Sequence, residues 1–396
     1  MKIPKGAEFI ISRLNEHGRR GDIVGGCVRD FLLGKEPADF DITTDALPEQ
    51  MRSIFSDLRT ADTGIKHGTL TVIVDSVPYE VTTYRIDGEY TDNRHPDKVS
   101  FTDKLSDDLS RRDFTVNAMC YNDNDGLTDI FGGEKDLSNG IIRAVGDPVS
   151  RFQEDSLRIL RALRFASTLD FVIEEETEKA IFNMVHLLVN VSRERIYAEW
   201  KKLISGVGAA RIISEYGSVI ATVIPELSSI CENPLPDGFA EADGQIRELA
   251  LFALASHEDA AQSFAFAMQS LRSDKKHRIF GASVLQNLDS FVENETDIRL
   301  LFVKIGVERA LCVIKLKILL GKADESLLSL ATQILASNPC CRISDMMING
   351  NDLSDIGIRG REIGQMLDRL LIMIAEGRVE NKKEELLALA KTLVFS

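Results

Sequence analysis

The sequence has no long apolar run. None of its hydrophobic stretches approaches the ~18 residues needed to cross a bilayer. Residues 1–20 have the spacing of an amphipathic helix, which differs from the short apolar core of a secretory signal peptide. These two absences predict a cytoplasmic protein that does not associate with a membrane.

Cysteine is scarce and scattered. The chain has 6 cysteines in 396 residues, and no C-x-x-C pair occurs among them. Structural zinc sites and the disulfide frameworks of small secreted domains use closely and regularly spaced cysteines. The sequence therefore predicts neither.

Positive charge is in deficit. The chain carries 47 Lys and Arg against 62 Asp and Glu, which gives a formal net charge of −15. A protein that coats nucleic acid usually has a basic excess, so that class is disfavoured. A nucleic-acid enzyme is compatible with this charge, because a local basic groove can bind the polymer while the rest of the surface stays acidic.

The order of helix and strand signals predicts an α/β head followed by an all-helical remainder. The chain is too long for one compact core, and it shows neither a repeat of fixed period nor a low-complexity linker. The expected early elements are a helix over 7–17, a strand over 22–24, a helix over 27–33, a strand over 39–43 and a hairpin around 76–78. From about Phe152 only helical spacing is expected, first over 154–169, then over 174–190 and 193–204.

A glycine pair and two alternating aspartates form the first candidate site. Gly25 and Gly26 stand where a strand turns into a helix, and such a turn lets backbone N–H groups approach a phosphate closely. Arg29, one turn into that helix, can add a charge-assisted hydrogen bond. Asp39 and Asp41 lie two apart on a predicted strand, so both carboxylates face one side. Magnesium, which takes one or two protein carboxylates and completes its shell with water and phosphate oxygens, suits this pattern.

Two further polar positions allow more than one interpretation. Glu80, on the strand "YEVTTY", is either another carboxylate near the metal or an ion-pair partner. Arg112 in "LSRRDFTVNAMCYN" either belongs to an ordinary helix start, with Asp113 at its positive end, or contacts a triphosphate or ribose.

The helix pattern "EDSLRILRALRFA" carries a polar stripe. Asp155 and Arg158 are i, i+3 neighbours, and Arg161 and Arg164 continue the stripe, while leucines at the same spacing mark an adjacent core face. One interpretation is a helix surface with ordinary ion pairs.

The other interpretation is that Asp155 and Arg158 recognise a base. A carboxylate only accepts hydrogen bonds and a guanidinium only donates them. Cytosine and adenine each offer an amino group beside a ring-nitrogen acceptor, whereas guanine and uracil offer the inverse pattern. Such a pair would accept C and A and reject G and U, by roughly 10⁴-fold if the site is dry.

Taken together, these stretches resemble the class II tRNA nucleotidyltransferases, the CCA-adding enzymes, which share a family with bacterial poly(A) polymerases. In chain order, the segments similar to the family's motifs A to E are "GGCVRDFLLG" with "DFD", "RRDFTVNAM", "TDIFGGEKDLSNGIIRAVGDP", "EDSLRILRALRF" and "SRERIYAEWKKLI". The resemblance implies a polymerase-β-like nucleotidyltransferase head over 1–140, a helical neck over 141–206, a helical body over 207–335 and a tRNA-binding helical tail over 336–396.

The resemblance also implies roles for particular residues. Asp39 and Asp41 would be the catalytic Mg²⁺ ligands. The expected nucleotide contacts are Gly26, Arg29, Arg112, Asp155, Arg158, Arg161 and Arg164, of which Asp155 and Arg158 would read the base.

The expected activity is therefore addition of C, C and A to the 3′ end of tRNA from CTP and ATP, with release of diphosphate. Rival activities are CC-only or A-only addition, and poly(A) synthesis. The segment 85–99, "RIDGEYTDNRHPDKV", favours terminal A addition, because CC-only members of the family are shortened in this loop. A non-catalytic RNA-binding protein on the same scaffold would be expected to lack the acidic pair, which this chain keeps. Whether the chain is a monomer or a homodimer stays open.

Overall fold

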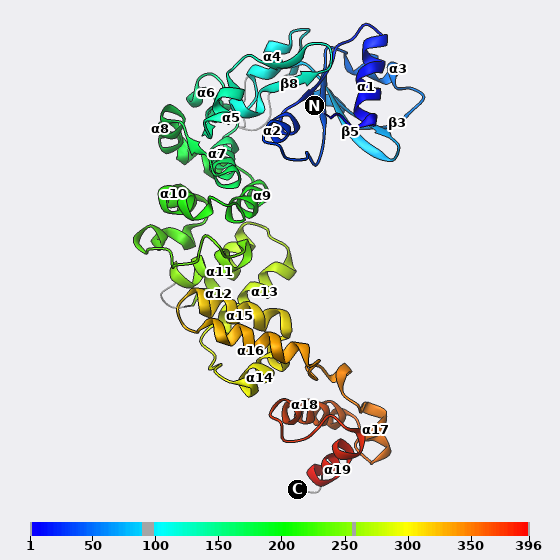
Figure 1. Ribbon diagram of the computed structural model, residues 1–396, viewed down its shortest axis with the longest axis vertical. Coiled ribbons are helices and arrows are strands. Elements are labelled where there is room, and N and C mark those ends of the chain that lie inside the picture. Colours follow the sequence, from blue (N-terminus) through cyan, green and yellow to red (C-terminus); the bar gives the residue numbers. More distant parts are fainter. Residues whose placement is uncertain (1, 89–98, 256–258, 395–396) are drawn as a thin grey trace. The chain divides into compact units, whose positions relative to one another are not determined.

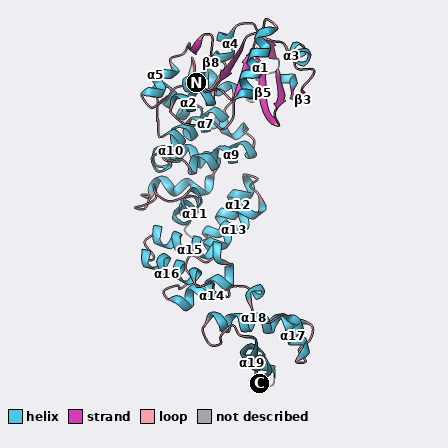
Figure 2. Cartoon of the chain, turned by 45° about the vertical axis from the view of Figure 1, so that its right-hand side comes forward, coloured by secondary structure: helices cyan, strands magenta, loops and turns pink. Residues whose placement is uncertain are grey.

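The computed structural model describes residues 2–88, 99–255 and 259–394, and the chain divides into two compact units, Met1–Val223 and Ile224–Ser396 (Figure 1). All strands that the structure describes lie in the first unit, and the described part of the second unit consists of helices and loops (Figure 2). The predicted class, an α/β head followed by helices, is confirmed. The finer division into head, neck, body and tail stays a prediction.

The first unit is built on a mixed sheet. Its strands are β1 (Gly21–Val24), β2 (Asp41–Thr44), β3 (Arg59–Gly64), β4 (Thr69–Val74), β5 (Val77–Thr83), β8 (Met119–Asn122) and β9 (Gly126–Asp129). They lie in the order β3-β4-β5-β2-β1-β8-β9. The pairing of β2 with β5 is parallel and the other pairings are antiparallel. The sheet therefore places β2 between β1 and β5.

Residues alternate between the two faces of this sheet. Ile42, Tyr79 and Val81 are buried on the face that helix α1 (Lys5–Glu16) covers. Gly6 of α1 lies so close to this face that an added Cβ would stand 2.6 Å from the Tyr79 hydroxyl. Because side chains alternate along a strand, Asp41 and Glu80 point to the opposite face.

Most of the predicted local elements of the sheet region are present. The hairpin between β4 and β5 turns at Asp75 and Ser76, both with positive φ (49° and 67°), as tight two-residue hairpins require. Helix α2 (Gly26–Leu32) follows the glycine turn as predicted. The strand expected over 39–43 instead begins at Asp41, so Asp39 lies in the loop that enters it.

Shorter elements complete the sheet region. They are α3 (Pro48–Ile54), α4 (Leu105–Ser110), α5 (Gly133–Ser138), the 3₁₀ turns η1 (Ile65–His67) and η2 (Thr115–Asn117), and the strand pair β6 (Arg85–Asp87) and β7 (Val99–Phe101). Residues 89–98, the greater part of the loop that bears on terminal A addition, lie outside the described residues.

Helices form the rest of the first unit. They are α6 (Pro148–Glu154), α7 (Leu157–Leu169), α8 (Glu175–Met184) with the 3₁₀ helix η3 (Val185–Asn190), α9 (Arg193–Ile204) and α10 (Ala209–Val223). Helix α9 has the predicted bounds. The helix expected over 154–169 is broken, because α6 ends at Glu154 and α7 begins at Leu157. The expectation that strands end before Phe152 is also wrong, since β10 (Ile141–Ile142) pairs in parallel with β11 (Val172–Ile173).

The second unit packs helices on helices. Its elements are η4 (Pro225–Glu232), α11 (Gly244–Ala255), α12 (Ala260–Ser270), α13 (Lys275–Gln286), α14 (Glu295–Ile305), α15 (Val307–Leu319), α16 (Glu325–Ala336), η5 (Ile343–Asp345), α17 (Gly350–Asp355), α18 (Arg361–Ala375) and α19 (Lys383–Val394). The last three helices share a core that includes Leu353, Leu370 and Leu386, all fully buried. Among the helices that the structure describes, none combines the length and the apolar character that a membrane span needs.

Candidate active site

The glycine turn lies between β1 and α2. Gly25 has φ 84° and ψ −131°, a conformation that glycine adopts without steric penalty. A Cβ on Gly25 would stand 3.0 Å from Nη1 of Arg112, so Arg112 packs directly over the turn. The sequence-predicted contacts Gly26 and Arg29 follow in the first turn of α2. The structure thus brings the glycine pair, Arg29 and Arg112 together.

The carboxylates gather where β2 begins, beside β5. The register pairs Ile42 with Val81, which places Asp41 beside Glu80, and Asp39 lies two residues before Asp41. Part of the Asp41 carboxylate reaches solvent. Even so, desolvation by the surrounding protein and repulsion from Asp39 and Glu80 raise the pKa of Asp41 to about 6, while Arg112 opposes the shift.

The oxygen donors of this acidic group suit a hard divalent cation. Repulsion among the three carboxylates would be relieved by a bound cation, and oxygen donors are the ligands that magnesium prefers. Within the described residues, no group of three or more His, Cys, Asp or Glu side chains is placed so that it could hold a metal ion. A cation bound by one or two of these carboxylates would take its other ligands from phosphate oxygens and water.

Arg112 is fixed by a buried acid. Its Nη2 lies 3.3 Å from Oδ2 of Asp108, and that carboxylate also accepts from the Thr43 hydroxyl at 3.1 Å and pairs with Arg111 at 2.6 Å. Burial alone would raise the pKa of Asp108, but the charges of Arg111 and Arg112 outweigh it and hold the pKa below its usual range. Arg112 is therefore anchored on one side and faces the glycine turn on the other.

A chain of hydrogen bonds connects the glycine helix to α7. Arg29 donates from Nη1 to Oδ1 of Asn117 at 2.7 Å. Asn117 donates from Nδ2 to Oδ1 of Asp113 at 3.1 Å, and Oδ2 of Asp113 accepts from Nε of Arg161 at 2.8 Å. Asp113 and Asn117 stand around the 3₁₀ turn η2 and not in the α-helix start that the sequence allowed.

Three arginines surround one aromatic ring. The guanidinium carbons of Arg164, Arg29 and Arg161 lie 3.4, 5.1 and 5.4 Å from the centroid of the Phe165 ring. Arg164 also donates from Nε to the buried Glu199 at 2.8 Å. The predicted contacts Arg29, Arg161 and Arg164 therefore form one cationic cluster on a shared aromatic platform.

The predicted base-reading pair does not lie on one helix. Asp155 has an extended conformation between α6 and α7 (φ −140°), and its Oδ1 accepts from the backbone N–H of Leu157 at 3.1 Å. Its carboxylate is paired with both terminal nitrogens of Arg195, at 3.2 and 2.7 Å. The side chain of Arg158 donates to Glu154 at 2.6 Å and to the Arg111 carbonyl at 2.8 Å.

The expectation of a helical Asp155–Arg158 pair is therefore wrong in its geometry. The aspartate caps the start of α7, and each side chain has a different charged partner. Sequence reasoning missed these partners, Arg195 and Glu154, and also Glu199. Arg195 and Glu199 lie on α9, far along the chain, and only the presence of charges on the buried side of that helix could have signalled them.

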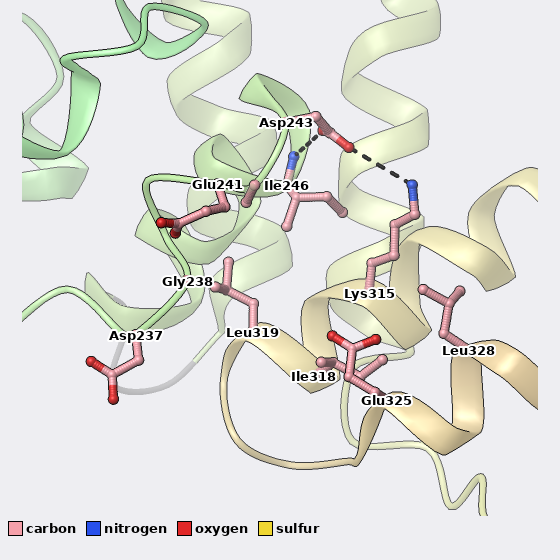
Figure 3. Close-up of a pocket in the computed structure, with 11 residues that line it drawn as sticks. Asp237, Gly238, Glu241, Asp243, Ile246, Lys315, Ile318, Leu319, Glu325 and Leu328 are labelled. Carbon is pink, nitrogen blue, oxygen red and sulfur yellow. Dashed lines mark hydrogen bonds and ion pairs between the residues drawn. The ribbon is translucent and has the colours of Figure 1, made fainter.

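The charged side chains that line a hollow in the second unit are mainly acidic, unlike the arginine cluster of the first unit (Figure 3). Its volume is about 380 Å³, and the side chains of Asp237, Glu241, Asp243 and Glu325 line it. Nζ of Lys315 lies 3.9 Å from Oδ2 of Asp243. Because carboxylates outnumber cations there, this hollow repels phosphate and does not suit a nucleotide.

Three family models match successive parts of the chain. Their descriptions are "Poly A polymerase head domain" for residues 22–143, "Probable RNA and SrmB- binding site of polymerase A" for residues 170–228, and "tRNA nucleotidyltransferase domain 2 putative" for residues 245–390. The first match contains the glycine turn, all three carboxylates and Arg112.

Curated relatives match along the whole chain. A CCA-adding enzyme of Ligilactobacillus salivarius is 37% identical, over 97% of this chain and 95% of the relative. A CCA-adding enzyme of Enterococcus faecalis is 36% identical, over 98% of this chain and 95% of the relative.

Solved structures show the same architecture. The crystal structure of a Bacillus stearothermophilus CCA-adding enzyme in complex with CTP has a TM-score of 0.82 and 31% identity, and the match covers 100% of this chain and 98% of that one. A Thermotoga maritima CCA-adding enzyme complexed with tRNA shares the fold, with a TM-score of 0.67 at 21% identity over 99% of this chain and 96% of that one.

Proposed function

The chain belongs to the family of the CCA-adding enzymes, and from this membership we propose that it extends the 3′ end of tRNA by C, C and A. CTP and ATP are the substrates, diphosphate is released, and no nucleic-acid template directs the additions. The observation that supports this activity best is the acidic group of Asp39, Asp41 and Glu80 beside a glycine turn that Arg112 covers. Since tRNA is the acceptor, we place the enzyme in the cytoplasm.

We propose that Asp39 and Asp41 hold magnesium, with Glu80 beside them. The bound metal would lower the pKa of the RNA 3′-hydroxyl and stabilise charge on the α-phosphate and the leaving diphosphate. The 3′ oxygen forms a bond to the α-phosphorus, the bond from that phosphorus to the diphosphate breaks, and the hydroxyl proton is lost to solvent. The parallel register of β2 and β5 sets Glu80 beside Asp41, which supports the role near the metal.

The triphosphate is assigned to the glycine turn. There the backbone N–H groups at Gly26 point from the start of α2, and Arg29 and Arg112 supply charge-assisted donors. Both arginines are largely buried and already held by Asn117 or Asp108. Binding would therefore cost little side-chain entropy, and positioning would account for much of the rate.

Base selection is assigned to Asp155 and Arg158, with Arg161 and Arg164 near the incoming nucleotide. The accept-and-donate pattern of an aspartate and an arginine matches cytosine and adenine. In this structure the aspartate is held by Arg195 and the arginine by Glu154. These partners would keep the two hydrogen-bonding groups fixed while bases are compared.

A single-nucleotide-resolution extension assay tests the function. The substrate is tRNA that ends at the discriminator base, supplied with CTP alone, ATP alone, both, or GTP with UTP. The expected products are two added residues with CTP and three with both nucleotides. A stop at two residues with both nucleotides would identify a CC-adding enzyme, long A-tracts a poly(A) polymerase, and efficient G or U addition would contradict the base-selection assignment.

A further inference from the structure

Phe165 of α7 lies at the centre of the arginine cluster, although its side chain is apolar. It is 4% exposed, and the guanidinium carbon of Arg164 lies 3.4 Å from the centroid of its ring. A guanidinium at this distance is stacked on the ring face. Phe114 packs against Phe165 edge to face, with ring centroids 5.7 Å apart and an interplanar angle of 77°, and such packing fixes the planes of both rings. The plane of the Phe165 ring therefore determines where the Arg164 guanidinium lies.

The three arginines of the cluster share this ring. Arg29 comes from α2, whereas Arg161 and Arg164 come from α7, and the guanidinium carbons of Arg29 and Arg161 lie 5.1 and 5.4 Å from the ring centroid. The hydrogen-bond acceptors of the three arginines are, in chain order of the donors, Asn117, Asp113 and Glu199. Each acceptor hydrogen-bonds to one guanidinium, whereas the ring contacts all three.

The charges in the cluster repel one another, and the negative face of the ring offsets part of this repulsion. Burial lowers the pKa of Arg164, the charge of Arg161 lowers it further, and the charge of Glu199 opposes both. Arginine nevertheless stays protonated in proteins. The cluster is therefore a set of largely desolvated charges, and a cation–π contact stabilises such charges more than it does at an exposed surface. A bound triphosphate would relieve the remaining repulsion.

We propose that Phe165 is a positioning residue of the nucleotide site and that it acts through the three arginines. Its ring face holds the guanidinium groups in the orientation that the triphosphate meets, so the groups need not reorganise when the nucleotide binds. The inference rests on the proposed function, which supplies the ligand, and it adds an apolar residue to a set of polar ones. Because a phenyl ring has no hydrogen-bonding group, it affects the affinities for CTP and ATP alike and leaves the choice between bases to other side chains.

Graded fluorination of Phe165 tests this role in the whole chain. Phenylalanines with one, two or three ring fluorine atoms keep nearly the same shape, but each fluorine withdraws electron density from the ring face and weakens its contact with a cation. Isothermal titration calorimetry in the presence of Mg²⁺ gives the Kd for CTP and the Kd for ATP. We expect both Kd values to rise with each fluorine, to about fivefold with three, and to rise about tenfold or more in Phe165→Leu.

Phe55 supplies the matched control. It is fully buried at the end of α3, a helix that packs against β4. The same fluorinated residues at position 55, and Phe55→Leu, should leave both Kd values unchanged. If Phe165→Leu proves unstable, the fluorinated series remains informative, because it opens no cavity in the core.

The results separate this inference from the proposed function. Constant Kd values across the fluorine series would overturn the inference, even if Phe165→Leu bound nucleotide weakly, because the ring would then only fill space. A rise for CTP alone or for ATP alone would also overturn it. If the Kd values rose as expected but the extension assay showed no addition to tRNA, the proposed function would fail and the positioning role in nucleotide binding would stand. If the unaltered chain bound neither nucleotide, both would be lost.

Discussion

The buried carboxylate of Asp113 and the half-buried guanidinium of Arg161 form an ion pair that joins the sheet region to helix α7. Oδ2 of the aspartate lies 2.8 Å from Nε and 2.5 Å from Nη2 of the arginine, although 48 positions separate them in the sequence. Asn117 donates a hydrogen bond to the same carboxylate and accepts one from Arg29.

Acid should weaken the fold through Asp113. Burial alone would raise the pKa of this carboxyl, but Arg161 and the hydrogen bond from Asn117 outweigh burial and hold the pKa well below its usual value of 3.8. A depressed pKa contributes stability that is present above the unfolded-state pKa and is lost as pH falls below it. Between about pH 6 and pH 3, the unfolding free energy of the unaltered chain should fall by about 1 kcal/mol more than that of Asp113→Asn.

Urea denaturation at each pH measures this difference. Asp57→Asn is the control, because Asp57 pairs with Arg13 at the surface, and it should leave the pH dependence nearly as it is. Parallel curves for the unaltered chain and Asp113→Asn would contradict the prediction.

Substitution of Gly25 should damage catalysis more than folding. Gly25→Ala puts a Cβ 3.0 Å from Nη1 of Arg112 at a backbone φ of 84°, so both the turn and the arginine must shift. We expect kcat/KM for CTP to fall about 10²-fold, as for other small misplacements of positioning groups. Gly18→Ala has a similar positive φ but open space around it, and it should retain full activity. Equal losses in the two variants would assign the effect to backbone strain alone.

Asp41 and Glu80 should differ in importance for catalysis. Asp41→Asn should lower kcat for nucleotide addition by more than about 10³-fold, because charge at the reacting phosphate loses its stabilisation. Glu80→Gln should lower kcat by about 10- to 100-fold, the range for groups that support a metal site. Filter binding of tRNA should be unchanged in both. A loss of tRNA binding together with activity would indicate misfolding and not a catalytic defect.

Substitution of Arg195 should lower the selectivity between nucleotides more than it lowers the rate of nucleotide addition. Arg195→Met frees the Asp155 carboxylate from its bidentate partner, so the preference for CTP over UTP should fall about tenfold. Arg193→Met, on the same helix but bonded to the Val223 carbonyl, should keep the preference. The readout is the ratio of kcat/KM values for the two nucleotides. An unchanged ratio in Arg195→Met would show that Asp155 does not depend on this arginine.

Local features of the site were predictable and pairings across the chain were not. The glycine turn and helix α2 follow from neighbouring residues, whose spacing and backbone preferences the sequence shows directly. The strand alternation expected for Asp39 and Asp41 fails, because β2 begins at Asp41 and Asp39 lies in the preceding loop. The parallel pairing of β2 with β5 brings Glu80 beside Asp41 through backbone register, which no short-range pattern contains. This is why the sequence left two interpretations of Glu80 open.

The error at Asp155 has a recognisable cause. Helical spacing across "EDSLRILRALRFA" suggested one continuous helix, yet aspartate is a frequent cap at a helix start. Its side chain accepts a hydrogen bond from the N–H of Leu157, and this contact competes with an extension of α7 toward the N-terminus. The capping tendency of Asp155 was therefore visible in the sequence, but the helical spacing of the neighbouring residues favoured one continuous helix.

The pairing of β2 with β5 also determines when, during folding, the active site can exist. Residues 21–44 form β1, α2 and β2 through short connections, so the glycine turn and the two aspartates can assemble early. We expect Glu80 to join them later, because the pairing of β2 with β5 must first close a longer loop. In that order of events a partly folded chain would have the phosphate-binding turn without its complete set of acids, and nucleotide addition would need the finished sheet.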